Sequence, residues 1–167
     1  MACSINGLIA EEDGNEDFLS DRNYEIMLEI LKEYDVLVWG RKTFDNVMSW
    51  GENYLEDLQN SNVAILSKNN TKEVNLNNIT YHKSLENCLS FCKKNNYNKI
   101  LVSGGAIVNN LFMENNIVDK IILNYNPYVL NRGIPMFRGE YFKNNLKLNK
   151  IVTESKGIAQ IHYDVLK

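Results

Sequence analysis

Three short and almost wholly apolar runs, at 35–39, 63–66 and 100–102, limit the folds that this chain can adopt. Runs of this length without alternation are typical of strands that are covered on both faces of a sheet. Between them, apolar residues recur with helical spacing over 24–34 and 85–92, which predicts amphipathic helices. The alternation of strand and helix indicates an α/β protein with a largely parallel sheet.

The pattern changes after Pro135. Residues 146–153 and 158–166 alternate apolar and polar side chains around the turn segment 154–157, which predicts an antiparallel hairpin. We therefore expect a mostly parallel central sheet with helices on both faces and an antiparallel C-terminal hairpin on one edge. The 167 residues, 44% of them hydrophobic, suit a single domain over 1–167, since no repeat or linker interrupts them.

The overall charge and composition exclude several classes of function. The formal net charge is -3 and the lysines are scattered, so a nucleic-acid partner is not expected. No apolar run reaches the length of a membrane span and no leader pattern opens the sequence, which favours the cytoplasm. The chain has three cysteines, Cys3, Cys88 and Cys92, and two histidines. Their number and spacing predict neither a disulfide framework nor a metal site.

The paired glycines Gly104 and Gly105 follow the third apolar run and precede a segment with helical spacing. A strand that ends at such a pair and continues as a helix brings backbone N–H groups and the positive end of the helix to one point. Two residues without side chains also let another molecule approach the backbone closely. The pair predicts a phosphate-binding turn, and the alternative is a turn that only changes the direction of the chain.

Two other predicted strands end in cations and hydroxyls. The segment Gly40-Arg41-Lys42-Thr43 follows the first strand, with Thr43 as a candidate helix cap, and Ser67-Lys68 follows the second. Ligands of open α/β sheets bind at the carboxyl ends of the strands, so these groups favour a polyanionic ligand, above all a dinucleotide with an extra phosphate. The sequence contains no G-x-G-x-x-G and no Walker A pattern, which argues against a Rossmann dehydrogenase and a P-loop enzyme.

In their order along the chain, several segments resemble the dihydrofolate reductase superfamily, including the reductase domain of the riboflavin-pathway deaminase–reductases. The segments that carry the resemblance are 4–10, Gly40-Arg41-Lys42-Thr43, Leu66-Ser67, Gly104-Gly105-Ala106, 118–121 and 127–137. The resemblance covers nearly the whole chain and implies a dihydrofolate reductase-like three-layer fold.

The resemblance implies NADPH as the cofactor and a cis peptide bond between Gly104 and Gly105. By this resemblance Ala2, Ile9 and Ala10 border the nicotinamide, Gly40, Arg41, Lys42 and Thr43 hold the pyrophosphate and 2′-phosphate, Ser67 and Lys68 flank the adenosine, and Ser103, Gly104, Gly105, Ala106, Ile107 and Val108 surround the diphosphate. The cations Arg41 and Lys68 favour NADPH over NADH.

The reaction that the resemblance implies is hydride transfer to a polarised carbon of a small heterocyclic substrate. The substrate is a pteridine or a riboflavin precursor of the 5-amino-6-(5-phosphoribosylamino)uracil type. With no histidine near these segments, a carboxylate or water supplies or orients the proton. Asp21 corresponds to the pterin-binding acid of dihydrofolate reductases, Asp17 is its rival, and a helix N-cap is the alternative role for Asp21. The expected substrate-side residues are Phe18, Tyr24, Met48 and Asn124, the last where the family often has a threonine that faces the acid.

Three departures from the riboflavin-pathway pattern leave the substrate open. Ser103 stands where that group usually has an acidic residue, Asn6 and Leu8 stand where it has Asp and Lys, and Phe44-Asp45-Asn46 stands where it has an Asp-Pro segment. Stand-alone members of the superfamily are the most similar. The alternative to an enzyme is a binding module that holds a nucleotide without turnover. A homodimer is common among the riboflavin-pathway relatives, and the sequence leaves the oligomeric state open.

Overall fold

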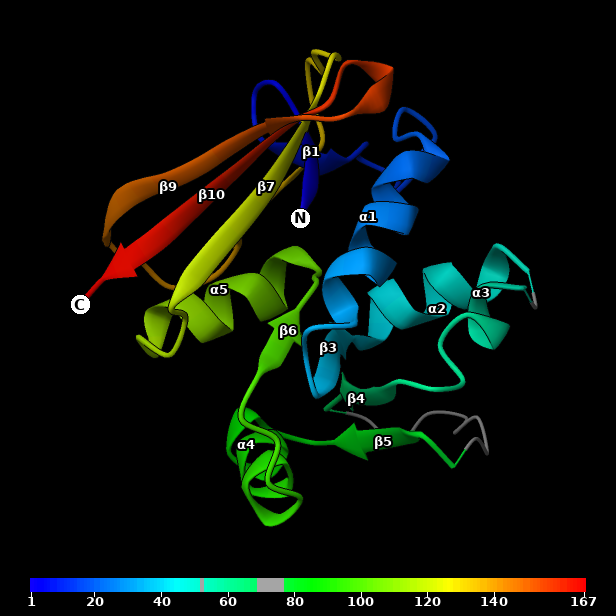
Figure 1. Cartoon of the computed structure of the whole chain (residues 1–167), viewed down its shortest axis with the longest axis vertical. Helices are drawn as coiled ribbons and strands as arrows, with labels where there is room; N and C mark the ends of the chain where they lie inside the picture. The colour runs from blue at the N-terminus through cyan, green and yellow to red at the C-terminus, as the bar shows by residue number, and fades with distance from the viewer. Residues whose placement is uncertain (52, 69–76) are drawn as a thin grey trace. The chain divides into compact units, whose positions relative to one another are not determined.

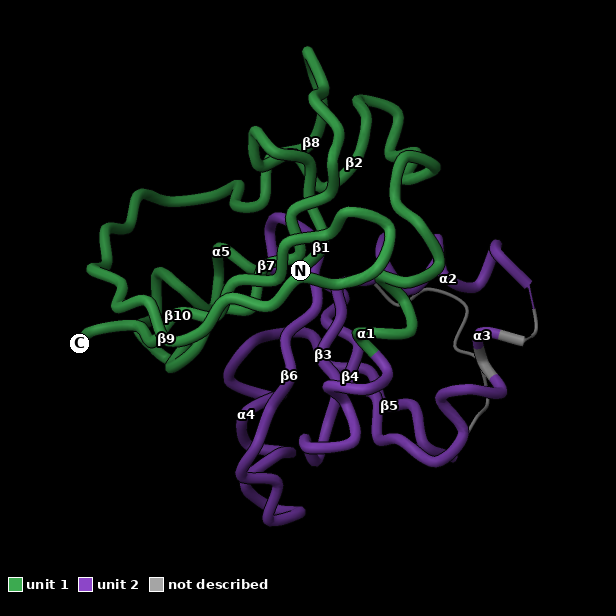
Figure 2. Tube along the Cα trace, turned by 45° about the horizontal axis from the view of Figure 1, so that its top comes forward, with its two compact units in different colours: residues 1–27, 109–167 green, residues 28–108 purple. Residues whose placement is uncertain are grey.

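A computed structural model describes residues 1–51, 53–68 and 77–167 of the chain (Figure 1). The chain divides into two compact units, one formed by residues 1–27 with 109–167 and the other by 28–108 (Figure 2). The boundaries of the units fall within two helices, α1 (Asp21–Leu31) and α5 (Ala106–Glu114). None of the helices in the described ranges is long and apolar enough to cross a membrane.

The unit of residues 28–108 contains a parallel sheet with the strand order β5-β4-β3-β6. Its strands are β3 (Val36–Gly40), β4 (Asn62–Leu66), β5 (Ile79–His82) and β6 (Ile100–Val102). Its helices are α2 (Arg41–Ser49), α3 (Asn53–Glu56) and α4 (Leu85–Lys94). The three apolar runs of the sequence are thus β3, β4 and β6, and all five residues of β3 are buried, as expected for a central strand.

The other unit contains a mixed sheet with the strand order β1-β7-β10-β9 and a two-stranded ribbon of β2 and β8. Its strands are β1 (Ala2–Ser4), β2 (Leu8–Ala10), β7 (Lys120–Asn126), β8 (Ile134–Pro135), β9 (Asn145–Thr153) and β10 (Ala159–Leu166). The strands β9 and β10 form the predicted hairpin, closed by a short 3-10 turn, η1 (Ser155–Gly157).

The α/β class and the antiparallel hairpin are confirmed. The central sheet differs in one respect from the expectation, because the hydrogen-bonded ladders of the described residues form two four-stranded sheets in place of one. Parallel pairing is concentrated in residues 28–108, where helices connect successive strands. In the other sheet the hairpin imposes antiparallel pairing on β7, β10 and β9.

The pairing register gives the sheet of β7, β10 and β9 two different faces. One face, here called the apolar face, carries Ile121, Leu123, Tyr125, Ile161, Tyr163, Val165, Leu146, Leu148 and Ile151. The opposite face, here called the amide face, carries Asn124, Asn126, Gln160 and His162. A register shift beside His162 and Tyr163 accommodates Asn149 as an extra residue in β9, which brings Leu148 and Ile151 to the same side.

Candidate functional site

The paired glycines lie directly against the end of β3. The backbone N–H of Gly40 donates to the carbonyl oxygen of Gly104 at 2.8 Å, and the N–H of Ser103 donates to that of Val38 at 3.1 Å. The peptide bond between Gly104 and Gly105 is cis, which agrees with the expectation, and Gly104 has φ +102. The structure therefore brings the two predicted glycine segments into direct contact within one unit.

The absence of side chains at this junction is a steric requirement. A Cβ at Gly40 would lie 2.9 Å from Cγ2 of Val108 and 3.7 Å from the backbone nitrogen of Gly105. A Cβ at Gly105 would lie 3.1 Å from the hydroxyl oxygen of Thr43. Glycine at both positions allows the backbone at the start of α5 to approach the start of α2.

Two helices begin at this junction. Helix α2 starts at Arg41, immediately after β3, and its N-cap Gly40 offers no side chain to the first N–H groups. Thr43 was a candidate cap in the sequence, but it is the third residue of the helix, because Gly40 already ends the strand. Helix α5 starts at Ala106, directly after the glycines. The first N–H groups of a helix have no partner within the helix, so the positive ends of two helices make this junction suitable for an anion.

Arg41 is held at the start of α2 by neighbouring groups. Its Nε donates to Oδ1 of Asp45 at 2.7 Å, and its guanidinium carbon lies 5.8 Å from the ring centroids of Phe44 and of Tyr81. Its side chain is 19% exposed. The guanidinium is thus oriented by Phe44, Tyr81 and Asp45, and Asp45 neutralises part of its charge.

The remaining cofactor residues expected in this unit surround the ends of β4 and β6. The N–H of Ser67 donates to the carbonyl oxygen of His82 at 2.9 Å, and Lys68 is exposed. Lys42 is exposed, Ser103 is half-buried, Ala106 and Val108 are buried, and Ile107 is 67% exposed. Met48, expected on the substrate side, is half-buried in α2 of this same unit.

The residues expected near the nicotinamide lie in the other unit, on β1 and β2. Ala2 pairs in register with Asn124 of β7. Ile9 and Ala10 are 9% and 3% exposed, and Ala10 pairs with Ile134 of β8. A Cβ at Gly133 would lie 2.2 Å from the carbonyl oxygen of Ala10, so glycine is required where the two strands meet.

The two expected carboxylates are both exposed. Asp21 is the first residue of α1, and Asp17 accepts a hydrogen bond from Nδ2 of Asn15 at 2.9 Å within the preceding loop. The side chain of α1 that reaches β7 is that of Asn23, which is 8% exposed and donates to Oδ1 of Asn126 at 2.7 Å. The resemblance places an acid at Asp21 and a threonine-like partner at Asn124, whereas the side chains that join α1 to β7 are the amides of Asn23 and Asn126.

The sequence prediction did not include Glu16, the carboxyl beside Asp17. Burial raises the pKa of Glu16 from 4.5 to about 7. No residue in the described part of the chain forms a hydrogen bond or ion pair with its side chain. A carboxyl with such a pKa is partly protonated at neutral pH, which suits a proton donor. Its only sequence signal is its place in the acidic loop after β2.

Of the amide face, the sequence prediction included only Asn124 as a site residue, and it missed Asn126, Gln160 and His162. Asn124, Asn126 and Gln160 are 4%, 2% and 6% exposed, and hydrogen bonds connect them to one another and to His162. Burial, with smaller contributions from Lys150 and Lys120, lowers the pKa of His162. The sequence does carry a pattern for this face, since polar residues alternate with apolar ones at 124 and 126 and at 160, 162 and 164.

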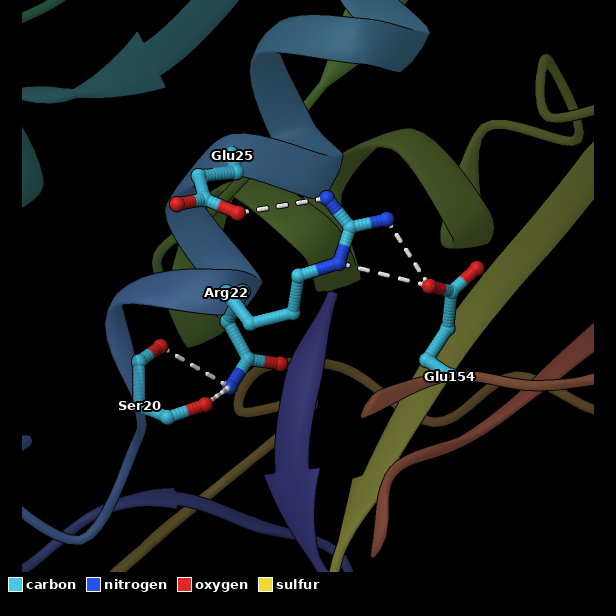
Figure 3. A network of polar contacts seen from close by, with 5 residues as sticks. Ser20, Arg22, Glu25 and Glu154 are labelled. Atoms are coloured by element: carbon cyan, nitrogen blue, oxygen red, sulfur yellow. Dashed lines mark hydrogen bonds and ion pairs between the residues drawn. The ribbon is translucent and has the colours of Figure 1, made fainter. Parts of the chain in front are cut away.

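An ion pair positions α1 above this face. Arg22 donates from Nη2 and Nε to Oε2 of Glu154, at 2.8 and 3.3 Å, and from Nη1 to Oε2 of Glu25 at 3.2 Å (Figure 3). The side chains of Arg22 and Glu154 are 21% and 19% exposed, so the pair is partly shielded from solvent. It links the first turn of α1 to the end of the hairpin and supports the contact of Asn23 with β7.

The two aromatic residues expected on the substrate side lie before and within α1. Phe18 is 9% exposed, and its ring meets that of Tyr128 edge to face, with 6.0 Å between centroids. Tyr24 is half-buried in α1. In the described ranges no group of three or more His, Cys, Asp or Glu side chains could hold a metal ion.

Comparison with known proteins identifies the family. The RibD C-terminal domain family matches residues 1–160. The chain belongs to this family. Its relatives include the uncharacterised Bacillus subtilis proteins YyaP, 26% identical over 98% of this chain and 91% of YyaP, and YwjB, 27% identical over 98% of this chain and 94% of YwjB.

Solved structures of the RibD type share the fold. A putative riboflavin biosynthesis protein from Shewanella has a TM-score of 0.79 at 22% identity, covering 100% of this chain and 97% of its own. A deaminase/5-amino-6-(5-phosphoribosylamino)uracil reductase from Thermotoga maritima has a TM-score of 0.73 at 15% identity, covering 99% of this chain and 55% of its own. As a RibD-type domain, the chain has the fold of a riboflavin-pathway reductase.

One departure from the riboflavin-pathway pattern has a structural role in this RibD-type domain. Asn6 lies in the turn between β1 and β2, where its Nδ2 donates to the carbonyl oxygen of Leu130 at 2.7 Å. Its Oδ1 accepts from the hydroxyl of Ser4 at 2.9 Å and from the N–H of Leu130 at 3.3 Å. Asn6 thus fixes the first loop against the loop after β7.

Proposed function

We propose that this RibD-type domain is an NADPH-dependent reductase that transfers hydride to a riboflavin precursor of the 5-amino-6-(5-phosphoribosylamino)uracil type. The observation that supports this most is the junction of Gly40 with Gly104 and Gly105. Two helices begin there, and a side chain at Gly40 would meet Val108, whereas one at Gly105 would meet Thr43. Such a junction leaves backbone N–H groups available to a diphosphate.

The residues of the junction fit a dinucleotide with an additional phosphate. Arg41 lies at the first position of α2, and Lys42 and Lys68 add two exposed cations at the ends of β3 and β4. The hydride comes from NADPH when it is bound. Of the chain's own residues, those of the junction bind the diphosphate, and the family resemblance places Ile9 and Ala10 beside the nicotinamide.

The amide pair of Asn23 and Asn126 favours a pyrimidine over a pteridine substrate. Pterin binding of the dihydrofolate reductase type uses an acid at the start of the first helix. Here the buried residue of α1 that meets β7 is an asparagine, and an amide does not ionise. Dihydrofolate is therefore the comparison substrate in the assay.

We assign the proton to Glu16 in preference to Asp17 and Asp21. The pKa of Glu16 is raised to about 7 by burial, whereas both aspartates are exposed. A protonated carboxyl can deliver a proton to the oxygen or nitrogen that becomes basic when hydride reaches the adjacent carbon. The loop that carries Glu16 directly follows β2 with Ile9 and Ala10.

The second candidate function is a nucleotide-binding module without turnover. The glycine junction and the cations would serve it equally well. The partly protonated Glu16 and the buried amide face favour the enzyme, because a module that only holds the cofactor needs neither. The enzyme would oxidise NADPH when its substrate is present, whereas the binding module would not.

The test measures binding of NADPH and NADH by fluorescence, followed by NADPH oxidation with 5-amino-6-(5-phosphoribosylamino)uracil or dihydrofolate. We expect the protein to bind NADPH more tightly than NADH. In Arg41→Ala the ratio of the two affinities should fall about tenfold. Lys93→Ala, which removes an exposed cation from the last turn of α4, should leave binding unchanged. Equal affinity for both cofactors, or no effect of Arg41→Ala, would contradict the cofactor assignment. Binding without oxidation would favour the binding module.

A further inference from the structure

The amide face carries a row of three side chains that lie next to one another across the sheet. Asn124 of β7 pairs with Ala2 of β1 on one side and with Gln160 of β10 on the other. Residues paired in register project from the same face, so Ala2, Asn124 and Gln160 are neighbours. His162, two residues after Gln160 in β10, follows on the same face.

Hydrogen bonds along this face run in one direction. Nε2 of His162 lies 2.6 Å from Oε1 of Gln160, and because an amide oxygen only accepts, the ring nitrogen donates. Nε2 of Gln160 then donates to Oδ1 of Asn124 at 3.1 Å. The acceptor of Asn124 is therefore occupied, and the group that Asn124 presents is its NH2.

The NH2 of Asn124 has no partner in the described part of the chain. The neighbouring Asn126 amide donates to the backbone carbonyl of Asn124 at 3.1 Å and does not reach this group. Asn124 is only 4% exposed, so solvent reaches little of it. Among the described residues, the only fully buried side-chain nitrogen or oxygen without a partner is Oδ1 of Asn144, so the unpaired NH2 of Asn124 keeps some access from outside the fold and can meet a ligand there.

The position of Asn124 indicates which ligand. Ala2, its partner in the ladder, is the residue that the family resemblance places beside the nicotinamide. A side chain in the same row would meet the part of the substrate close to the reacting carbon. Two N–H donors are complementary to a carbonyl oxygen and incompatible with an amino group at the same place.

We infer that Asn124 binds a ring carbonyl oxygen of the heterocyclic substrate, and that Gln160 and His162 hold its amide in the donating orientation. The inference rests on the proposed function, since it assumes that the substrate lies against this face. Asn124 contacts the substrate, whereas Gln160 and His162 are positioning residues that act through it. A pyrimidinedione provides such an oxygen.

One substitution can reverse the direction of the hydrogen bonds that run from His162 through Gln160 to Asn124. His162→Gln keeps an N–H donor for Gln160 and preserves the order of donors and acceptors. His162→Glu offers only acceptors when ionised, and Lys150 and Lys120 favour the ionised form. Gln160 must then donate to the new carboxylate, its oxygen turns to Asn124, and Asn124 presents an oxygen to the substrate. The pair of variants differs little in size and has opposite polarity.

The experiment compares KM for 5-amino-6-(5-phosphoribosylamino)uracil and the Kd of NADPH in four proteins: wild type, Asn124→Asp, His162→Gln and His162→Glu. We expect KM to rise at least about tenfold in Asn124→Asp and His162→Glu and to stay within about threefold in His162→Gln, with the Kd of NADPH unchanged in all four. Similar KM values in the two His162 variants, or an unchanged KM in Asn124→Asp, would overturn the inference. Thermal unfolding establishes that each variant is folded.

A second readout separates this inference from the proposed function. In nitrogen-15-labelled wild type, the side-chain NH2 resonance of Asn124, identified by its loss in Asn124→Asp, is followed while uridine 5′-monophosphate is added. The resonance should shift in wild type and His162→Gln and stay in place in His162→Glu. If wild type shows this shift without oxidising NADPH, the reductase proposal fails and the role of Asn124 stands. If wild type oxidises NADPH and the resonance does not move, the role of Asn124 fails alone.

Discussion

The side-chain amide of Asn23 donates to Oδ1 of Asn126 over 2.7 Å, and this contact joins the first turn of α1 to β7. Asn126 returns a longer hydrogen bond from its Nδ2 to Oδ1 of Asn23, at 3.3 Å. Each amide thus donates and accepts in the same pair. Such a pair needs no charge and tolerates burial, whereas a carboxylate in either place would leave two oxygens facing each other.

Asn23→Asp should lower the free energy of unfolding by about 3 kcal/mol at pH 7, because a buried carboxylate would face Oδ1 of Asn126. Burial would raise the pKa of the introduced carboxyl above its value in the unfolded chain. The deficit should therefore shrink as the pH falls and the carboxyl regains a donor. Urea unfolding at pH 7 and pH 5 measures this. Asn131→Asp, on an exposed loop, is the control, and equal losses in the two variants would contradict the prediction.

Gly40→Ala should destabilise the protein by about 2 kcal/mol, because the new Cβ would lie 2.9 Å from Cγ2 of Val108, a β-branched side chain that cannot turn aside. The matched variant Val108→Ala removes the obstructing methyl group. In the double variant, Gly40→Ala should cost much less than it does alone. Thermal unfolding of the wild type, the two single variants and the double variant gives the coupling free energy between positions 40 and 108. Strictly additive effects would show that the contact with Val108 is not the cause.

Glu16→Gln should remove a pH dependence of stability. The pKa of Glu16 is raised to about 7 in the folded protein from an ordinary value of 4.5, so the folded state binds more protons between these values. The wild type should therefore lose stability, by up to about 2 kcal/mol, as the pH rises from 4.5 to 7. Urea unfolding across this range should give a flatter profile for Glu16→Gln. Glu12→Gln, at an exposed position of the same loop, should keep the wild-type slope.

The apolar face should mediate association of two copies of the chain. On β9, Leu148 and Ile151 are 51% and 60% exposed, and no residue of the face is charged, so two identical faces can meet without repulsion. We expect a dimer by light scattering coupled to gel filtration, and a monomer for Ile151→Glu. Lys150→Glu changes the neighbouring residue on the opposite face and should remain dimeric. A monomeric wild type, or two dimeric variants, would contradict this prediction.

The sequence predicted β3, β4 and β6 of the parallel sheet and the hairpin because their patterns depend on local burial, but it did not predict β5 at Ile79–His82. The expected 35–39 and 146–153 correspond to β3 at Val36–Gly40 and β9 at Asn145–Thr153. The contact of Gly40 with Gly104 could also be predicted from the sequence, because the ends of parallel strands meet at one edge of the sheet.

The sequence did not predict which face of α1 meets β7. One residue changes the direction of a helical side chain by about 100°. The loop before the helix therefore decides whether Asp21 or Asn23 faces the sheet, and its conformation has no simple pattern. Most of the amide face was overlooked for a different reason. Asn124 was named through the family resemblance, but the chain is rich in asparagine at turns, and Asn126 of β7 was not distinguished from these until its burial was known.

The division of the chain between its two units has a consequence for its synthesis. Residues 28–108 are continuous, so the ribosome has delivered every strand of the parallel sheet before β7 is made. Strand β1, by contrast, finds its partner only when β7 emerges, and until then the first residues of the chain have no sheet to join. The unit with the glycine junction can thus fold while translation continues, and the unit with the amide face is completed last.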